Sequence, residues 1–253
     1  MRLQYVSDLH LEFPENKVFI KNNPIEPKGD ILVLAGDVLP FILIDKHKDF
    51  FNYVSDNFEQ VYWVPGNHEY YHFDAAKKSG AFCENIRSNV SLLNNQTIVL
   101  DSVHLIFSTL WSRISPDNWW HIEKNMNDFR IIKYDGYRFS FDHYNQLHAQ
   151  GLAFVENALD TAGESLKKVV VSHHVPTYLN YPEQYKGSLL SDAFTVELFP
   201  LIEKKQPDFW IYGHHHINTP GFEIGKTQLL TNQLGYVRYG EQALFQSDKI
   251  ILL

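Results

Sequence analysis

Histidines, carboxylates and an asparagine recur in five short blocks of the sequence, and each block follows an apolar run. The blocks are VSDLH (6–10), AGDV (35–38), PGNHE (65–69), SHHVPT (172–177) and GHHH (213–216). Imidazole nitrogens and carboxylate or amide oxygens are donors that bind transition metals without a thiolate partner. Because Cys83 is the only cysteine, a metal centre in this chain would depend on mixed nitrogen and oxygen ligands.

Seven side chains in these blocks are candidate metal ligands. Asp8 and His10 lie two residues apart on an extended segment, so both can turn toward one ion where the strand ends. Asp37 carries two oxygens and could bridge two ions. The full set of candidates is Asp8, His10, Asp37, Asn67, His173, His214 and His216. Since one ion has only about four to six ligand positions, seven candidates predict two ions per chain.

Residues next to the candidates carry further expectations. A glycine precedes a candidate at Gly36, Gly66 and Gly213, where a missing Cβ permits a sharp turn and a close backbone approach. His215 lies between two candidates on an extended segment, so we expect it to point the other way, behind the ligands or toward solvent. Cys83 is expected to be a small buried apolar residue.

The apolar runs are predicted to be β-strands, because they are short and bounded by turn residues. They cover 3–6, 31–35, 61–64, 104–108, 168–172, 209–212, 227–231 and 249–253. Amphipathic spacing predicts a helix at 145–162 and weaker ones at 43–58, 74–88 and 191–205. This alternation predicts a layered α/β fold, with antiparallel pairing added after residue 216. All five blocks then lie at carboxyl ends of strands, the edge at which open α/β sheets bind ligands.

Composition limits the classes of function. A chain of 253 residues with 44% hydrophobic side chains can fill a substantial core, and no repeat or linker divides it, so one domain over 1–253 is expected. The net charge of −8 argues against long nucleic acid as the main partner. No run has the length of a signal peptide or of a membrane span, which predicts a cytoplasmic protein without membrane contact. The oligomeric state is left open.

The order of the blocks resembles that of the calcineurin-like metallophosphoesterase superfamily. D-x-H, G-D, G-N-H-E, H-H-x-P and G-H-x-H follow one another between residues 6 and 216. The resemblance implies a four-layer α/β/β/α sandwich, in which two mixed β-sheets are flanked by helices. It also implies a site for two divalent transition-metal ions, with manganese as our first choice and iron, zinc, cobalt or nickel as alternatives.

The resemblance also assigns roles to the candidate residues. It implies that one ion is held by Asp8, His10, Asp37 and His216, and the other by Asp37, Asn67, His173 and His214. His68 would be the catalytic residue, which binds no metal and contacts the phosphoryl oxygens or the leaving group. Within the histidine doublet the resemblance favours His173 as the ligand. His174 is the alternative ligand, or a substrate contact.

The implied reaction is hydrolysis of a phosphodiester or phosphomonoester by a metal-bridging hydroxide, on a small or nucleotide-like substrate. The chain reads GDVLPFI and GNHEYYHF, without the arginines found there in protein Ser/Thr phosphatases, which disfavours phosphoprotein substrates. The stretches STLWS, NMNDFR and HHVPT are more similar to bacterial predicted phosphohydrolases. A nuclease or nucleotide pyrophosphatase of the same superfamily is an alternative. A non-catalytic metal-binding scaffold for protein interaction is another, although loss of ligands would be expected there.

Residues 111–144 form a long segment rich in aromatic side chains and arginine, between the G-N-H and H-H blocks. Trp119 and Arg130 are of the types that stack on flat groups and pair with anions. We expect this segment to form a wall over the metal site that reads the non-phosphate part of the substrate. The alternative is that its rings fill a satellite core, since large aromatic side chains are usually buried.

Overall fold

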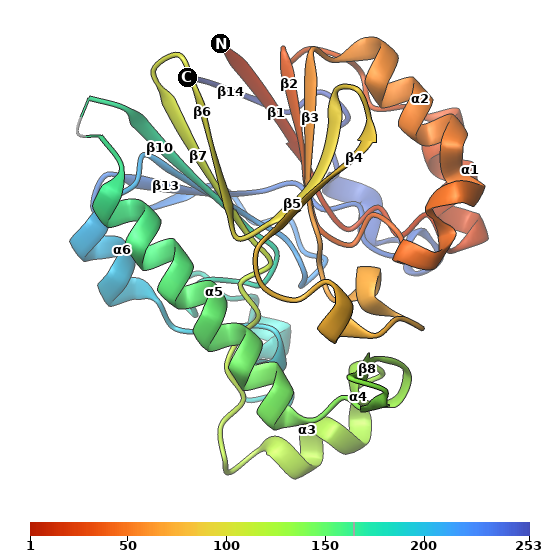
Figure 1. Ribbon diagram of the computed structural model, residues 1–253, viewed down its shortest axis with the longest axis vertical. Coiled ribbons are helices and arrows are strands. Elements are labelled where there is room, and N and C mark those ends of the chain that lie inside the picture. The colour runs from red at the N-terminus through yellow and green to blue at the C-terminus, as the bar shows by residue number, and fades with distance from the viewer. Residues whose placement is uncertain (164) are drawn as a thin grey trace.

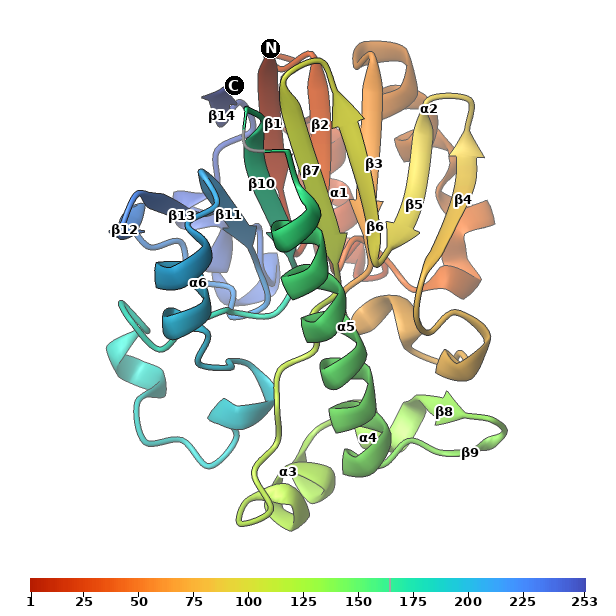
Figure 2. The same ribbon diagram turned by 60° about the vertical axis from the view of Figure 1, so that its left-hand side comes forward.

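Two six-stranded mixed sheets pack face to face between layers of helices (Figures 1 and 2). The computed structural model describes residues 1–163 and 165–253. The first sheet has the order β14-β1-β2-β3-β5-β4, and the second has the order β12-β13-β11-β10-β7-β6. This arrangement confirms the α/β/β/α sandwich implied by the resemblance.

In each sheet four parallel strands lie between two antiparallel edge strands. The first sheet comprises β1 (Arg2–Val6), β2 (Ile31–Ala35), β3 (Gln60–Val64) and β5 (Val90–Asn94), with β4 (Phe82–Arg87) and β14 (Ile250–Leu252) at its edges. The second comprises β7 (Val103–Ser108), β10 (Lys167–Ser172), β11 (Phe209–Tyr212) and β13 (Thr227–Thr231), with β6 (Gln96–Leu100) and β12 (Phe222–Ile224) at its edges. The carboxyl ends of the parallel strands therefore open on one side of the molecule.

Helices cover the outer face of each sheet (Figure 1). The first sheet carries α1 (Pro14–Asn22) and α2 (Lys48–Asn57), and the second carries α5 (Phe141–Thr161) and α6 (Phe199–Lys205). A smaller unit lies beyond the carboxyl ends of the strands in both views and contains α3 (Trp119–Asn125), α4 (Asp128–Ile131), β8 (Lys133–Tyr134) and β9 (Tyr137–Arg138). Short 3₁₀ helices span Phe41–His47, His68–Tyr70, Ala75–Lys77, Glu183–Tyr185, Ser191–Ala193, Val237–Tyr239 and Glu241–Leu244.

Alternating side chains of the central strands fill different layers of the core. Val33 in β2 and Val171 in β10 point between the two sheets and share one buried cluster. Their neighbours Leu34 and Val170 point outward and pack under the helices. Because both faces of these strands are covered, their buried stretches are largely apolar, which is why short apolar runs marked them in the sequence.

The eight predicted strands are present, and their ends differ from the prediction by at most one residue. The helix predicted at 74–88 is wrong, because pairing with β5 makes residues 82–87 the edge strand β4. Cys83 lies in this edge strand and is exposed, not buried as predicted. The weaker helices are shorter than predicted: α2 begins at Lys48 after a 3₁₀ helix, and α6 begins at Phe199.

The prediction missed α1, β5, β6 and β12, and it gave no elements within 111–140. Antiparallel pairing near the C-terminus is present as expected, in the β12–β13 and β14–β1 pairs. In the part of the chain that the structure describes, every helix is too short or too polar to cross a membrane.

Candidate metal centre

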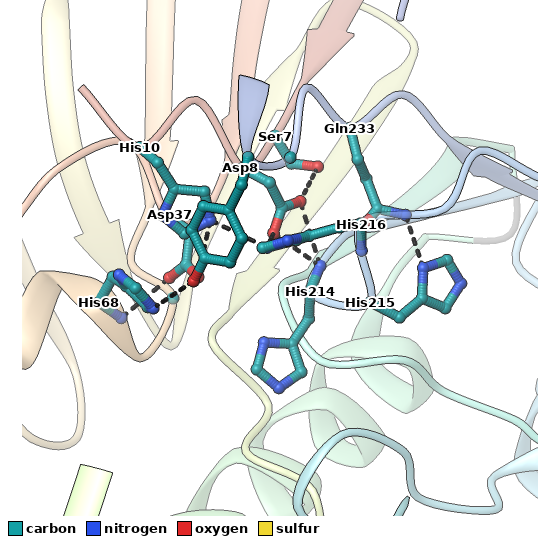
Figure 3. A network of polar contacts seen from close by, with 12 residues as sticks. Ser7, Asp8, His10, Asp37, His68, His214, His215, His216 and Gln233 are labelled. Atoms are coloured by element: carbon teal, nitrogen blue, oxygen red, sulfur yellow. Dashed lines mark hydrogen bonds and ion pairs between the residues drawn. The ribbon is translucent and has the colours of Figure 1, made fainter. Parts of the chain in front are cut away.

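The five polar blocks meet where the two sheets end. Asp8 follows β1, Asp37 follows β2 and Asn67 follows β3, all from the first sheet. His173 follows β10 and His214 follows β11, both from the second sheet. Because these five strands are parallel neighbours within their sheets, their carboxyl ends deliver the side chains to one buried region (Figure 3).

Five candidate ligands have a left-handed backbone conformation. The φ angles are 56° at Asp8, 46° at His10, 53° at Asp37, 80° at His214 and 55° at His216. Positive φ is uncommon for residues other than glycine, and such conformations cluster at functional sites, where they cost on the order of 1–3 kcal/mol each. These residues therefore leave their strands in turns that a regular strand would not adopt.

One group of donor atoms is formed by Asp8, His10, Asp37 and His216, which lie within 4.8 Å of one another. His10 Nε2 is 2.9 Å from His216 Nε2 and 3.7 Å from Asp37 Oδ2, and His216 Nε2 is 3.4 Å from Asp8 Oδ1. Two ligands about 2.1 Å from one tetrahedral or octahedral ion lie roughly 3.0–3.4 Å apart. The spacing of these donors thus fits a single ion.

A second group is formed by Asp37, His173 and His214. His173 Nε2 lies 3.4 Å from Asp37 Oδ1 and 3.1 Å from His214 Nδ1. Asp37 thus turns one oxygen to each group. Asn67 lines the same cavity as Asp37 and His214, and its Oδ1 is buried and accepts no hydrogen bond from the residues that the structure describes. This free acceptor can complete the second group.

Each of the four histidines in the two groups places its other ring nitrogen against an acceptor. The pairs are His10 Nδ1 with Glu12 Oε1 (3.3 Å), His216 Nδ1 with Glu241 Oε2 (2.8 Å), His173 Nδ1 with the Ala35 carbonyl (2.9 Å) and His214 Nε2 with the Ala193 carbonyl (3.2 Å). An acceptor there fixes the ring N–H on the outer side, so the lone pair of the other nitrogen points into the group. Metal-binding histidines are held in this way.

The carboxylates dominate the electrostatics of the centre. Burial raises the pKa of Asp37, but the neighbouring His173 and His68 outweigh it and hold this pKa well below its ordinary value. Burial lowers the pKa of His173, but Asp37 and Asp8 raise it to about 9. In the same way, Asp8 and Glu241 raise the pKa of His216 to about 10 against the effect of burial. The centre therefore attracts cations, and without ions it holds protons.

His68 lies beside the two groups and lines the cavity. Its Nδ1 is 2.8 Å from Glu12 Oε1, its backbone N–H donates to Asp37 Oδ1, and its Nε2 is 3.3 Å from the Tyr236 hydroxyl. Burial lowers the pKa of His68, but Asp37 and Glu12 outweigh it and raise this pKa. A held imidazolium next to a metal centre can donate a proton or stabilise negative charge.

Glu69 is a buried residue of the centre whose role the sequence did not reveal, although it belongs to the G-N-H-E block. Its carboxylate accepts backbone N–H groups of Asp37, Val38 and Gly66 and the indole N–H of Trp63, at 2.7–3.0 Å. It thereby ties the loop after β2 to the loop after β3. The sequence prediction also missed Glu12, Asp128 and Glu241. Like Glu69, these residues are not candidate ligands themselves; they hold candidate ligands in place through hydrogen bonds.

A cavity of about 430 Å³ opens beside the centre. Its lining comprises Asp37, Asn67, His68, Tyr71, Asn125, Met126, Asn127, Tyr181, Tyr185, Ser188, Leu190, Ser191, Phe194, His214, His215, His216, Tyr236 and Glu241. The segment 111–144 contributes residues 125–127, so part of it borders the cavity. Ligand sites commonly have about 300–1,000 Å³, so a small substrate fits here.

The three predicted substrate contacts lie outside this lining. Trp119 stacks on Phe141, with ring centroids 5.3 Å apart, and Arg130 bonds to the Lys124 carbonyl. His174 is fully buried behind the second group, with its ring centroid 4.3 Å from that of His214. It belongs to neither donor group.

His215 points away from the two groups (Figure 3). Its Nδ1 is 2.9 Å from Gln233 Nε2, and only 3% of the residue is exposed. Of the two positions expected for it, the one behind the ligands is correct and the solvent-facing one is wrong.

The expected close approach at glycines is also confirmed: a Cβ at Gly36 would lie 2.2 Å from His173 Nδ1.

Buried histidine and aspartate groups at the shared edge of two mixed sheets define a metallophosphoesterase architecture. Residues 1–218 match the calcineurin-like phosphoesterase family. The chain is 34% identical over 266 residues to an uncharacterized protein of Acanthamoeba polyphaga mimivirus, which covers 92% of this chain and 91% of that protein. This chain belongs to the calcineurin-like phosphoesterase family.

Two solved structures share the fold. A phosphopantetheinyl hydrolase from Mycobacterium tuberculosis is similar with a TM-score of 0.76 and 17% identity, over 99% of this chain and 95% of that one. A dimetal phosphatase from Danio rerio is similar with a TM-score of 0.52 and 13% identity, over 92% of this chain and 87% of that one. At these identities the likeness is one of fold.

Proposed function

We propose that this protein is a dinuclear metal-dependent phosphoesterase that hydrolyses a small phosphodiester or phosphomonoester. The observation that carries the proposal is the arrangement of the four histidines, each with one nitrogen against an acceptor and the other directed into a donor group. Such an arrangement suits a bound cation, because the inward nitrogens face each other 2.9 and 3.1 Å apart and need an ion between them, or a shared proton when no ion is bound.

In this proposal Asp8, His10, Asp37 and His216 hold one ion, and Asp37, Asn67, His173 and His214 hold the other. Mixed imidazole, carboxylate and amide donors suit manganese, iron, zinc, cobalt or nickel better than calcium or magnesium, with manganese as first choice. Two such ions, when bound, polarise the phosphoryl oxygens and supply a hydroxide nucleophile near neutral pH.

The protein's own contribution to the reaction comes from His68. Glu12 fixes its Nδ1, so Nε2 is the nitrogen that is free to serve the substrate, beside the Tyr236 hydroxyl. From this position His68 stabilises the charge that develops on the leaving oxygen and returns a proton to it. Glu69 keeps the loops that carry Asp37 and His68 in register.

The experiment is a substrate panel with controlled metal content. Protein stripped with a chelator and reconstituted with manganese, zinc or iron is assayed on para-nitrophenyl phosphate, bis(para-nitrophenyl) phosphate, a phosphopantetheinyl ester, a dinucleotide pyrophosphate and single-stranded DNA. The phosphopantetheinyl ester is included because of the fold likeness to a phosphopantetheinyl hydrolase. We expect a mono- or diester to be hydrolysed, with activity lost on chelation and restored by metal.

Other results would favour the alternatives. Preference for the pyrophosphate or for DNA would make the protein a nucleotide pyrophosphatase or a nuclease. No hydrolysis of any substrate by protein that holds two ions would make it a metal-binding scaffold. An Asp37→Asn variant serves as the inactive control, because this residue turns one oxygen to each donor group.

A further inference from the structure

Away from the donor groups, His68 and Glu241, the cavity wall consists of uncharged side chains. On one side it is formed by Asn125, Met126 and Asn127, at the end of α3 and in the link to α4. On the other side it is formed by residues between 181 and 194, which are tyrosines, serines, a leucine and a phenylalanine. Among the described residues no lysine or arginine lines the cavity, and its acidic members are Asp37 and Glu241.

This composition constrains the substrate. The phosphoryl group to be cleaved is served by the metal centre and His68, but a second phosphate, sulfate or carboxylate on the far wall would meet no lysine or arginine and would lie near Glu241. Recognition of such groups ordinarily uses arginine or lysine. Asparagine, serine and tyrosine instead bind amides and hydroxyls, and Met126, Leu190 and Phe194 add apolar contact.

We propose that this wall selects phosphoesters whose organic group carries no further negative charge and is a neutral chain or ring with amide or hydroxyl groups. The proposal rests on the phosphoesterase function and names its substrate class. It disfavours nucleoside polyphosphates among the nucleotide-like substrates.

A matched pair of diesters tests it: para-nitrophenyl para-carbamoylphenyl phosphate and its para-carboxyphenyl counterpart, which differ by one charge at nearly constant shape. We expect kcat/KM for the carboxamide to exceed that for the carboxylate at least about tenfold, since a like charge is poorly screened in a cavity. Asn127→Lys, which puts a cation on the exposed rim, should reduce this ratio at least about fivefold. The matched control Asn127→Gln should leave the ratio unchanged.

Equal use of both esters, or an unchanged ratio in Asn127→Lys, would overturn the proposal while leaving the phosphoesterase function standing. Hydrolysis of neither diester, nor of the monoester para-nitrophenyl phosphate, by protein that holds two ions would instead overturn the phosphoesterase function, and this proposal with it.

The hydrogen bonds of buried Asp128 support a second inference that is independent of the cavity wall. It lies at the start of α4 in the NMNDFR stretch and is fully buried. Its Oδ1 accepts from Asn67 Nδ2 at 3.0 Å and from the Tyr71 hydroxyl at 2.9 Å. An asparagine side chain can present either its oxygen or its NH₂ group, and a carboxylate accepts only the NH₂ group.

We infer that Asp128 is a positioning residue, which orients the Asn67 amide so that its oxygen remains free for the second ion. This gives residues 111–144 a role at the metal centre. It also explains why Asn67 Oδ1 is buried without a partner among the described residues while Nδ2 is bonded.

The test compares Asp128→Leu with Asp128→Asn in metal titrations followed by calorimetry. In Asp128→Leu the affinity for one of the two ions should fall about 10–100-fold while the other is retained, the usual effect of losing a group that orients a ligand. Asp128→Asn keeps an acceptor and should recover part of the loss. If both variants bind each ion as tightly as the unaltered protein does and differ only in a lower unfolding temperature, Asp128 has a merely structural role and the inference is overturned.

Discussion

A methyl group added at Gly66 would collide with the metal centre. An alanine Cβ at this position would lie 2.2 Å from Asp37 Oδ1 and 2.6 Å from His173 Nε2, whereas ordinary contacts begin at 3.4 Å. Neither side chain can retreat easily, because Asp37 Oδ1 accepts the His68 backbone N–H and His173 Nδ1 is held by the Ala35 carbonyl. The Asp37 oxygen must therefore move by about 1 Å.

The size of this displacement sets the expected loss. Ligand atoms must stay within about 0.2 Å of their proper distances from an ion, so a shift of about 1 Å removes a ligand. A misplacement of this size also costs on the order of 10²-fold in rate. We therefore expect Gly66→Ala to lower kcat on bis(para-nitrophenyl) phosphate at least about 100-fold and to lower bound metal, as measured by elemental analysis.

Gly151→Ala is the matched control. A Cβ at Gly151 in α5 would lie 3.0 Å from Ser108 Oγ and 3.4 Å from Leu110 Cα, away from the centre, so activity and metal content should be retained. Thermal unfolding in chelator shows whether each variant is folded. Wild-type kcat and metal content in a folded Gly66→Ala variant would refute the assignment of Asp37 and His173 as ligands.

Three further predictions follow from the site. His68→Ala should keep its metal and lose on the order of 10²-fold in kcat; loss of metal in elemental analysis would make His68 a ligand. Trp119→Ala and Arg130→Ala, which lie outside the cavity lining, should leave KM for small phosphoesters within about twofold; a large rise in steady-state KM would return them to the substrate site. In chelated protein the raised pKa values of His173 and His216, about 9 and about 10, contribute stability that is complete below their ordinary value of 6.5 and is lost as pH rises through the folded values. The melting temperature without metal should therefore fall between pH 7 and 10, and a flat or rising profile would contradict these shifts.

The strands and the meeting of the five blocks could be predicted because their signals are local. Apolar runs such as 31–35 are buried on both faces, and carboxyl ends of parallel strands converge whatever lies between them. Residues 82–87 show the limit of this reasoning. They have a weak helical spacing but form β4, since pairing with β5 decides their structure.

The outer contacts of the site could not be predicted for a similar reason. Glu12 lies just before α1 and contacts His68, Asp128 lies in α4 and contacts Asn67, and Glu241 lies in the C-terminal region and contacts His216. No spacing in the sequence relates the members of these pairs to each other. The aromatic richness of 111–144 was visible, but it marks rings such as Phe129 and Phe139, which are buried in the core. The cavity contacts come from 125–127, which carry no such signal.

The stoichiometry of bound metal tests the central claim most directly. Chelator-stripped protein reconstituted with excess manganese, freed of unbound metal and measured by elemental analysis should hold two ions per chain. The Asp37→Asn variant should hold fewer than two ions, because Asp37 turns one carboxylate oxygen to each donor group. The His215→Ala variant should still hold two ions, because His215 points away from both groups. A stoichiometry of zero or one in the unaltered protein, or equal losses in the two variants, would contradict the dinuclear centre.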